Sequence, residues 1–317
     1  MNEKYSVIVN KRLVEAENVV VLDLISATES PLPEIEAGSH IDLFLPNGLI
    51  RQYSLCQDPS LKGVFRLGIL KDEASRGGSL SAFNDISEGM QLQVSHPKNL
   101  FPLLDASHSV LVGGGIGITP LITMAYDLLN NNKSFELHYC AASKQTAAFV
   151  DEIKQGPLAS YTTFHFKDDG ANHREFFDHA MKDIAKDSHL YTCGPNGFMD
   201  WIINLAESKG FSSDQLHKEY FQVDIDLGGA SFEVVAQQSG KTIQVAPEET
   251  ILQALAREGI KVELSCEQGV CGTCMCDVLE GEPDHRDVYF TDEEKESNEQ
   301  ILVCCSRSKT PRLVLDI

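Results

Sequence analysis

The sequence predicts a multidomain protein made of a small β-barrel, an α/β domain with a parallel sheet, and a compact α+β domain. Short apolar or alternating runs, separated by prolines and glycines, fill residues 5–104. Strands then alternate with helices over Ser109–Gln222, which indicates a parallel sheet. In the last part of the chain, six of the nine cysteines fall between Cys266 and Cys305. A length of 317 residues is sufficient for two or three such domains.

Composition and charge exclude several classes of protein. No apolar run approaches the roughly 20 residues of a membrane-spanning helix, and the first residues lack the basic and apolar regions of a signal peptide. The formal net charge of −21 disfavours nucleic acid and anionic lipid as partners. An odd number of unevenly placed cysteines indicates metal ligation in a reducing compartment, not a disulfide framework. We therefore expect a cytoplasmic protein that binds neither nucleic acid nor membrane.

The first region contains a strand, RQYSL, with the character of a ligand site. Alternation along this strand places Arg51 and Tyr53 on one face, and Gln52 and Ser54 on the other. An ordinary surface strand with an exposed arginine has the same pattern, so the segment alone does not decide. Other strands are expected at Tyr5–Val9, Val19–Ile25 and His40–Leu45.

A second segment of the first region, KDEASRGGSLSAF, combines backbone amides, cations and the start of a short helix. Free amide groups at a helix N-terminus together with two cations form a plausible phosphate cradle. A surface loop that opens a helix is the alternative. The residues of the candidate cradle are Lys71, Arg76, Gly77, Gly78 and Ser79.

The second region opens with a buried strand, a glycine-rich turn and an amphipathic helix over Ser109–Leu129. Such a βα unit binds a dinucleotide pyrophosphate at the helix N-terminus. The strict G-x-G-x-x-G spacing is not met, because Ile118 takes the place of the last glycine. A second tight turn, CGPNGF, follows a predicted strand and opens another helix. The turn residues are Gly113, Gly114, Gly115, Gly117, Cys193, Gly194 and Pro195.

The third region is expected to be a compact α+β fold that follows a glycine-containing linker. A helix is predicted after Pro247, with acidic residues in its first turn and Gly259 at its end. The predicted strands are Phe232–Val235, Thr242–Val245, Ile301–Cys304 and Arg312–Leu315.

Four cysteines of this region have the C-x4-C-x2-C spacing, closed by a distant fourth cysteine, that is typical of plant-type 2Fe-2S clusters. Gly269 and Gly272 lie within the loop, where positive φ angles and amide groups turned toward sulfur are needed. A structural zinc site is the alternative, but it usually has two C-x2-C pairs, and here only Cys271 and Cys274 form one. The predicted ligands are Cys266, Cys271, Cys274 and Cys304.

Two further cysteines, Cys276 and Cys305, are adjacent to predicted ligands but out of register with the pattern. If Cys305 were the fourth ligand, a strand at this position would have to turn by one residue and face the other way. We therefore choose Cys304.

Acidic residues are concentrated between Asp277 and Glu299, where Arg286 and Lys295 are the only cations. One interpretation is a solvated face, and the other is a surface that steers a basic partner toward the cluster. The acidic residues are Asp277, Glu280, Glu282, Asp284, Asp287, Asp292, Glu293, Glu294, Glu296 and Glu299.

Taken together, these motifs resemble the phthalate dioxygenase reductase family, the reductase partners of Rieske-type oxygenases, which include vanillate demethylase reductases. The resemblance covers nearly the whole chain in the family's domain order. It implies an FMN-binding β-barrel domain (1–105), a NAD-binding α/β domain (106–224), a linker (225–231) and a plant-type 2Fe-2S ferredoxin domain of β-grasp type (232–317). Its blocks are RQYSL, GGS, GGGIGITP, CGP, KEYF, SCEQGVCGTC, PDHRD and CCSR.

The resemblance also implies roles for individual residues toward FMN. Ser54 would lie near the flavin N5 atom that accepts the hydride, and Thr119 and Phe221 would border the flavin from the side of the second domain. The remaining residues implied to hold the flavin ring or its phosphate are Arg51, Gln52, Tyr53, Lys71, Gly77, Gly78 and Ser79.

For NADH, the resemblance implies binding across Gly113–Thr119 and Cys193–Pro195, with Cys193 beside the nicotinamide. Glu219 stands where related reductases carry a carboxylate near that ring. Ser54, Cys193 and Glu219 are thus the expected catalytic residues. Relatives often have arginine at the position of Ala142, which leaves the choice between NADH and NADPH open, although the family favours NADH.

The function implied by the resemblance is to pass electrons from NADH through FMN and a 2Fe-2S cluster to a Rieske-type oxygenase. Aromatic acids, methoxybenzoates and quaternary amines such as carnitine are substrates of oxygenases served in this way. One alternative is a redox-sensing iron–sulfur flavoprotein, and another is an NADH reductase of a separate ferredoxin. Such reductases are often monomers, and a monomer is expected here.

Overall fold

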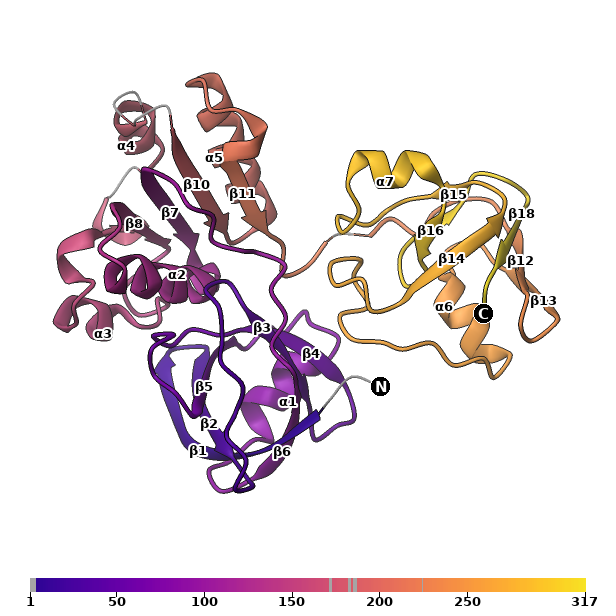
Figure 1. The fold of residues 1–317 in the computed structure, drawn as a ribbon, viewed down its shortest axis with the longest axis horizontal. Coiled ribbons are helices and arrows are strands. Elements are labelled where there is room, and N and C mark those ends of the chain that lie inside the picture. The colour runs from indigo at the N-terminus through magenta and orange to yellow at the C-terminus, as the bar shows by residue number, and fades with distance from the viewer. Residues whose placement is uncertain (1–3, 171–172, 182–183, 185–186, 224) are drawn as a thin grey trace. The chain divides into compact units, whose positions relative to one another are not determined.

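The computed structural model describes residues 4–170, 173–181, 184, 187–223 and 225–317 (Figure 1). The chain divides into two compact units, Met1–Glu219 and Tyr220–Ile317. Asp224, the predicted end of the second domain, lies outside the described residues. Among the described residues, none of the helices has both the length and the apolar character required to cross a bilayer.

The first unit begins with a six-stranded antiparallel sheet in the order β4-β3-β6-β1-β2-β5. The edge strands β4 and β5 approach each other through a bridge between Leu55 and Leu67, so the sheet curves into a barrel. β5 and β6 are additional to the strands that the sequence predicts. The elements are β1 (Lys4–Ala16), β2 (Val19–Ser26), β3 (His40–Phe44), β4 (Ile50–Ser54), β5 (Val64–Leu70), α1 (Gly78–Asn84) and β6 (Gln91–Ser95).

The continuous apolar run of β2 is explained by burial on both of its faces. Val20, Leu22 and Leu24 belong to the core of the barrel. Val19 and Val21 point the other way and join the core of the following parallel-sheet layer. Because neighbouring residues of a strand alternate between its faces, a strand packed on both sides requires apolar residues at nearly every position.

The rest of the first unit is a five-stranded parallel sheet in the order β11-β10-β7-β8-β9 (Figure 1). The chain adds β8 and β9 on one side of β7, and β10 and β11 on the other, so the order reverses between β7 and β10. The elements are β7 (His108–Gly114), α2 (Ile118–Asn130), β8 (Phe135–Ala141), α3 (Val150–Gln155), β9 (Thr162–Phe166), α4 (His173–Ala180), β10 (Ser188–Cys193), α5 (Asn196–Ser208) and β11 (Leu216–Glu219).

Helices cover both faces of the parallel sheet. Leu111 of β7 packs in one core with residues of α2 and α3. Its neighbours Val110 and Val112 pack in a second core with residues of α4 and α5. Ligands of such sheets bind at the carboxyl ends of the strands where the order reverses, which here is the end of β7 and β10.

The second unit contains a five-stranded mixed sheet in the order β13-β12-β18-β14-β16 and a two-stranded sheet of β15 and β17. Helix α6 packs on the larger sheet and contributes Ile251, Ala254 and Leu255 to its core. The elements are β12 (Phe232–Ala236), β13 (Lys241–Val245), α6 (Ile251–Arg257), β14 (Met275–Glu280), β15 (Pro283–Asp284), α7 (Asp292–Ser297), β16 (Gln300–Leu302), β17 (Arg307–Ser308) and β18 (Arg312–Leu315).

The predicted start of helix α6 is wrong in one respect. The acids after Pro247 precede the helix, and its first turn contains no acidic residue. Thr250 instead forms a capping box, in which its hydroxyl accepts from the Gln253 amide at 3.0 Å and the Gln253 side chain accepts from the Thr250 amide at 3.0 Å. These two bonds satisfy amide donors that have no partner within the helix. The predicted stop is confirmed, because Gly259 adopts a positive φ of 77° directly after the helix.

Candidate active site and cluster-binding loop

The three predicted catalytic residues come together in the first unit. The Ser54 hydroxyl, at the end of β4, donates to the Glu219 carboxylate at 3.2 Å. Glu219 ends β11 and is the register partner of Cys193, which ends the neighbouring parallel strand β10. The barrel and the parallel sheet thus each supply part of one polar cluster at the point where the strand order reverses.

Burial determines the electrostatics of this cluster. The carboxyl group of Glu219 is enclosed by protein, although the residue as a whole is partly exposed, and its burial raises the pKa from 4.5 to about 8. Burial, and then the nearby Glu219 carboxylate, raise the pKa of the fully buried Cys193 thiol well above 9. Cys193 is therefore a neutral thiol, and Glu219 is a carboxyl group that can titrate near neutral pH.

Helix α2 holds the parallel-sheet layer against the barrel beside this cluster. The Thr123 hydroxyl donates to the Leu55 carbonyl at 2.5 Å, one residue after Ser54. A Cβ added to Gly68 of β5 would lie 2.9 Å from the methyl group of Thr119, so these backbones can approach only because residue 68 is glycine. Thr119, predicted to border the flavin, is buried at this contact. The role of Thr123 was not predictable from its position in the helix.

The two glycine turns predicted to bind the nucleotide pack against each other. Gly117 ends a short 3-10 turn (Gly115–Gly117) between β7 and α2. A Cβ there would lie 2.2 Å from the Cys193 carbonyl oxygen, so only glycine fits. The other turn residues lie alongside: Gly113 pairs with Cys193 in the sheet, and Gly114 lies against Gly194 and Pro195.

The RQYSL segment forms strand β4, as predicted, and its side chains have distinct neighbours. The Arg51 side chain crosses Gly78 at the start of α1, where an added Cβ would lie 2.6 Å from it. The Gln52 amide lies 3.2 Å from the His40 ring. Tyr53 packs against the core of the barrel, and this burial raises its pKa.

The loop predicted to be a phosphate cradle is held together by hydrogen bonds of Ser79. Its hydroxyl accepts from the Asp72 amide at 3.2 Å and donates to Ser75 at 3.0 Å. Gly77 stands before the first residue of α1 with a φ of 87°. The Lys71 ammonium lies over the Phe83 ring and 3.5 Å from Glu73. The predicted loop, the start of helix α1 and Lys71 therefore lie close together in the structure.

In the second unit, the four predicted cluster ligands form two pairs. Cys266 hydrogen-bonds with Cys271, and Cys274 with Cys304. Each bond lowers the pKa of one thiol, Cys271 or Cys304, and raises the pKa of its partner, so one sulfur of each pair is favoured as the thiolate. Within the described ranges, no three histidine, cysteine, aspartate or glutamate side chains are grouped as ligands of a single ion. Two pairs of sulfurs are the donor set that two irons with two thiolates each require.

Backbone amide groups of the loop point at these sulfurs. The Gln268 amide donates to the Cys266 sulfur at 3.3 Å, and the Thr273 amide to the Cys271 sulfur at 3.5 Å. Gly269 adopts a φ of 70°, and a Cβ there would lie 2.7 Å from the Cys305 sulfur. The predicted need for glycine in this loop is thereby confirmed. Amide donors to sulfur are the environment of a protein-bound iron–sulfur cluster, so the residues present fit that group.

The local structure around Cys304 differs from the prediction. Strand β16 ends at Leu302, and Cys304 and Cys305 lie in a turn, where the amides of Cys305 and Ser306 return to the Leu302 carbonyl. The argument from strand register therefore does not apply. In the turn, the Cys304 sulfur receives the Gly269 amide and hydrogen-bonds with both Cys274 and Cys305. The fully buried Cys305 sulfur contacts Cys304, the Leu302 carbonyl and the Ser306 hydroxyl, and not the other predicted ligands among the described residues.

Asp287 supports the cluster loop in a way that the sequence did not reveal. It is only 4% exposed, and its carboxylate accepts from the amides of Tyr289 and Phe290 at 3.2 and 3.0 Å. The next residue, Val288, donates its amide to the Gly269 carbonyl at 3.1 Å. Asp287 is therefore a structural residue beneath the loop and does not belong to an acidic outer surface. Phe221, predicted to border the flavin, is 38% exposed in the second unit.

The first unit joins a barrel to a parallel sheet at Ser54, Glu219 and Cys193, and the second unit contains a loop with four cysteines. Together these features are those of a modular electron-transfer reductase. The model of the 2Fe-2S iron-sulfur cluster binding domain matches residues 234–309. Vanillate O-demethylase oxidoreductase of Pseudomonas sp. strain HR199 is 44% identical over 98% of this chain and 99% of the relative. The chain belongs to the phthalate dioxygenase reductase family of flavin- and 2Fe-2S-containing oxidoreductases.

Two further comparisons agree with this assignment. The carnitine monooxygenase reductase subunit of Escherichia coli K12 is 37% identical over 95% of this chain and 94% of the relative. The solved structure of phthalate dioxygenase reductase is 34% identical and covers 99% of this chain and 98% of that chain, with a TM-score of 0.78. That structure is described as modular, for electron transfer from pyridine nucleotides to [2Fe-2S]. The three-domain fold predicted from the sequence is thereby confirmed.

Proposed function

We propose that this protein is the reductase component of a two-component Rieske-type oxygenase and passes electrons from NADH through FMN and a 2Fe-2S cluster to that oxygenase. The observation that carries the proposal is the convergence of Ser54, Cys193 and Glu219 from the barrel and the parallel sheet, in a chain that also contains a cluster loop. NADH donates electrons in pairs and the oxygenase takes them singly, and a flavin with a one-electron cluster supplies that conversion.

For the flavin, we propose FMN, held by the β4 strand and by the loop before α1. Support comes from the contact between Arg51 and Gly78, which joins these two segments, and from the resemblance to phthalate dioxygenase reductase. Ser54 would hold the reactive edge of the flavin, and Thr119 and Phe221 would border it. The remaining residues assigned to FMN are Gln52, Tyr53, Lys71, Gly77 and Ser79.

For the nucleotide, we propose NADH, held by Gly113–Thr119 and Cys193–Pro195. The sequence left NADPH open because Ala142 stands where relatives often have arginine, with Lys144 two residues further on. In the structure the Lys144 ammonium is paired with Asp151 at 2.9 Å. Lys144 is the only cation in the turn Ala142–Thr146. Because the Asp151 carboxylate lies next to it, this turn would repel the 2′-phosphate of NADPH, which supports NADH.

Replacing Asp151 with asparagine is therefore expected to relax the nucleotide preference. The variant loses the repulsive charge but keeps the shape of the side chain, so the ratio of kcat/KM for NADPH to that for NADH should rise about three- to tenfold, as for removal of one exposed charge. Glu152 lies next to Asp151 but pairs with Arg66, so E152Q is the matched control and should leave the ratio unchanged. An unchanged ratio in D151N would reject this explanation of the preference.

For the cluster, we propose Cys266, Cys271, Cys274 and Cys304 as ligands, with Cys276 and Cys305 excluded. The paired sulfurs and the amide donors described above support this set. The nine free cysteines are consistent with the reducing conditions of a cytoplasm, in which we place the protein.

The proposed partner is an oxygenase that docks on the acidic ferredoxin domain of a monomeric reductase. Helix α7 begins with Asp292, Glu293 and Glu294, and Met275, 40% exposed, directly follows the ligand Cys274. An acidic helix in the domain that carries the cluster fits a basic docking face. Because relatives at 44% and 41% identity are vanillate O-demethylase oxidoreductases, an oxygenase of methoxybenzoates is the first partner to test, and a carnitine oxygenase the second.

The proposal is tested by mixing the purified reductase with NADH and each oxygenase and measuring product formed per NADH consumed. We expect product formation with one of these oxygenases, with a rate that falls as ionic strength rises. If only a separate ferredoxin restored turnover, the protein would instead be a ferredoxin reductase. Slow NADH oxidation with every acceptor would favour a redox sensor.

A further inference from the structure

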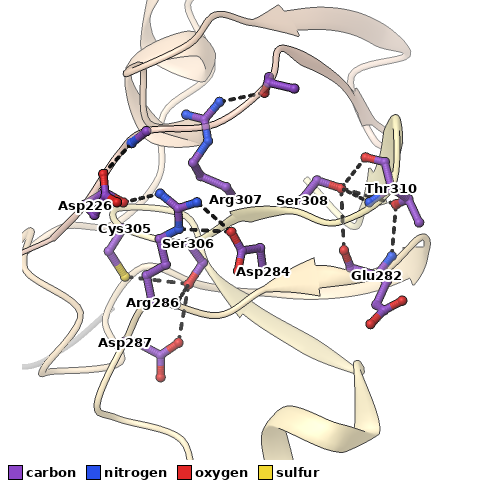
Figure 2. Close-up of polar contacts among 12 residues, drawn as sticks. Asp226, Glu282, Asp284, Arg286, Asp287, Cys305, Ser306, Arg307, Ser308 and Thr310 are labelled. Carbon is purple, nitrogen blue, oxygen red and sulfur yellow. Dashed lines mark hydrogen bonds and ion pairs between the residues drawn. The ribbon is translucent and has the colours of Figure 1, made fainter.

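The segment predicted to be the linker is held on the ferredoxin domain by an arginine. The Arg286 guanidinium donates through Nη1 to the Asp226 carbonyl, and through Nε and Nη2 to the Asp284 carboxylate at 3.0 and 2.6 Å (Figure 2). Asp284 lies in β15, so Arg286 connects the linker backbone to a strand of the domain.

A second arginine holds the end of the same segment. Arg307, in β17, is only 1% exposed. Its guanidinium donates to the carbonyl of Ala230 at 2.9 Å and to those of Glu249 and Ala246 at 2.6 and 3.2 Å. It also lies over the ring of Phe232, 5.2 Å from the ring centre. A buried guanidinium that binds three carbonyl groups is a fixed anchor, because leaving any of these donors unpaired would be costly.

A turn in the linker backbone brings it close to both arginines. The Asp226 carboxylate accepts from the Gly228 amide at 2.8 Å, which turns the chain. Gly229 has a φ of 152°, and a Cβ there would lie 3.2 Å from Arg307 Nε and 3.6 Å from Arg286 Nη2. A glycine therefore suits both the positive φ of this position and the close approach of the two guanidinium groups.

The same arginines stand next to the cluster-binding residues. The Arg286 amide donates to the Ser306 hydroxyl at 3.2 Å, and this hydroxyl donates to Asp287 at 3.3 Å (Figure 2). Ser306 and Arg307 follow Cys304 and Cys305 in the chain. The residues that hold the linker are thus built into the segments that hold the cluster loop.

We propose that Arg286 and Arg307 form a linker clamp, which makes residues 226–230 part of the ferredoxin domain and thereby shortens the tether across which electrons pass from the flavin to the cluster. The inference rests on the proposed function for its consequence, but the clamp itself is a property of the second unit alone. Arg286 and Arg307 are positioning residues, since neither is a cluster ligand.

The expected consequence follows from the length of the connection. With the clamp, residues 220–225 are the chain between β11 and the held segment, and without it residues 220–231 are the chain between β11 and β12, a connection about twice as long. The effective concentration of one tethered module near another falls roughly as the −3/2 power of tether length, so doubling the length lowers it about threefold. Release of the clamp should therefore slow reduction of the cluster by the flavin about threefold.

The test compares Arg286→Ala with Arg257→Ala in the full-length, cofactor-loaded protein. Arg257 is a matched control, because it also binds a carboxylate, Glu249, and a backbone carbonyl, Gln244, but does not contact the linker. Hydrogen exchange of a peptide that spans 225–231 reports the clamp directly, and stopped-flow absorbance reports flavin and cluster reduction separately. In R286A, Arg307 still holds Ala230, so the connection lengthens only to residues 220–229. We therefore expect faster exchange, about twofold slower cluster reduction, and unchanged flavin reduction, cluster content and EPR spectrum. R257A should match the wild type in all of these.

Gly229→Val disturbs the clamp from the linker side and leaves both arginines in place. It should also speed exchange and slow cluster reduction, because the added side chain meets both arginines. The double variant should be no more than about threefold slower than the wild type, the limit for complete release of the linker. Wild-type exchange and wild-type cluster reduction in both variants would overturn the proposal, as would loss of the cluster signal in R286A. If the wild type itself passes no electrons from NADH to the cluster, the proposed function fails, and hydrogen exchange alone then decides whether the clamp exists.

Discussion

Replacing Cys271 with serine is expected to abolish electron transfer to cytochrome c or to the oxygenase while leaving reduction of ferricyanide by NADH intact. Cys271 is the most exposed predicted ligand, and its sulfur pairs with Cys266 and receives the Thr273 amide. Removing one thiolate breaks the donor set in the second unit, whereas the Ser54–Cys193–Glu219 cluster of the first unit is unaffected. Loss should exceed about 100-fold with the one-electron acceptor, as expected when a redox centre is lost.

Neighbouring cysteines provide controls for this experiment. Cys276 lies in β14, two residues after Cys274, and its sulfur contacts the Cys274 carbonyl at 3.8 Å. C276S should keep the cluster, and C305S should do the same, whereas C304S should behave like C271S. Iron content and visible absorbance measure each outcome. A cluster that survives in C304S but is lost in C305S would show that the fourth ligand was assigned to the wrong residue.

Glu219→Gln is expected to slow reduction of the flavin by NADH and to remove its dependence on pH near 8. Because burial raises the pKa of Glu219 to about 8, the carboxyl group is neutral at pH 6 and ionised at pH 9. Hydride loss leaves positive charge on the nicotinamide, which a nearby carboxylate stabilises. The wild-type rate should therefore rise as pH increases through 8. At pH 9 we expect E219Q to be about 100-fold slower, with a smaller difference at pH 6.

The same ionisation has the opposite effect on stability. The folded protein binds the Glu219 proton more tightly than the unfolded chain, so this contribution to the free energy of unfolding is present below pH 4.5 and is lost as pH rises through about 8. E219Q should lack that loss. Glu136 lies in the same sheet and pairs with His138 at 3.4 Å. The variant E136Q is therefore the control for removing a carboxylate from this sheet, and it should keep the pH dependence of the wild type. A wild-type pH profile in E219Q would contradict the role proposed for Glu219.

Local patterns predicted much of the fold and of the cofactor sites. RQYSL forms a strand, the glycine turns follow parallel strands, and Gly269 has the positive φ that a cluster loop requires. These features depend on residue types within short segments, where spacing and backbone conformation are closely linked. The cysteine spacing likewise indicated a cluster domain, which the family model over 234–309 supports.

Contacts between distant segments were not predictable from the residues alone. Ser54 and Glu219 are 165 positions apart, and their proximity depends on the order of strands in two sheets. Strand β11, which places Glu219 beside Cys193, was not among the predicted strands. The contacts of the linker were not predictable for a similar reason, because Gly228 and Gly229 are typical of a linker and do not reveal that Arg286 and Arg307 bind it.

The most direct test of the account is an anaerobic titration of the purified protein with NADH, then with NADPH, followed by visible absorbance and low-temperature EPR. We expect NADH to bleach the flavin and to produce the rhombic signal of a reduced 2Fe-2S cluster, with NADPH much less effective. Bleaching of the flavin without that signal would contradict the central claim, because it would mean that electrons from NADH do not reach a cluster in this chain.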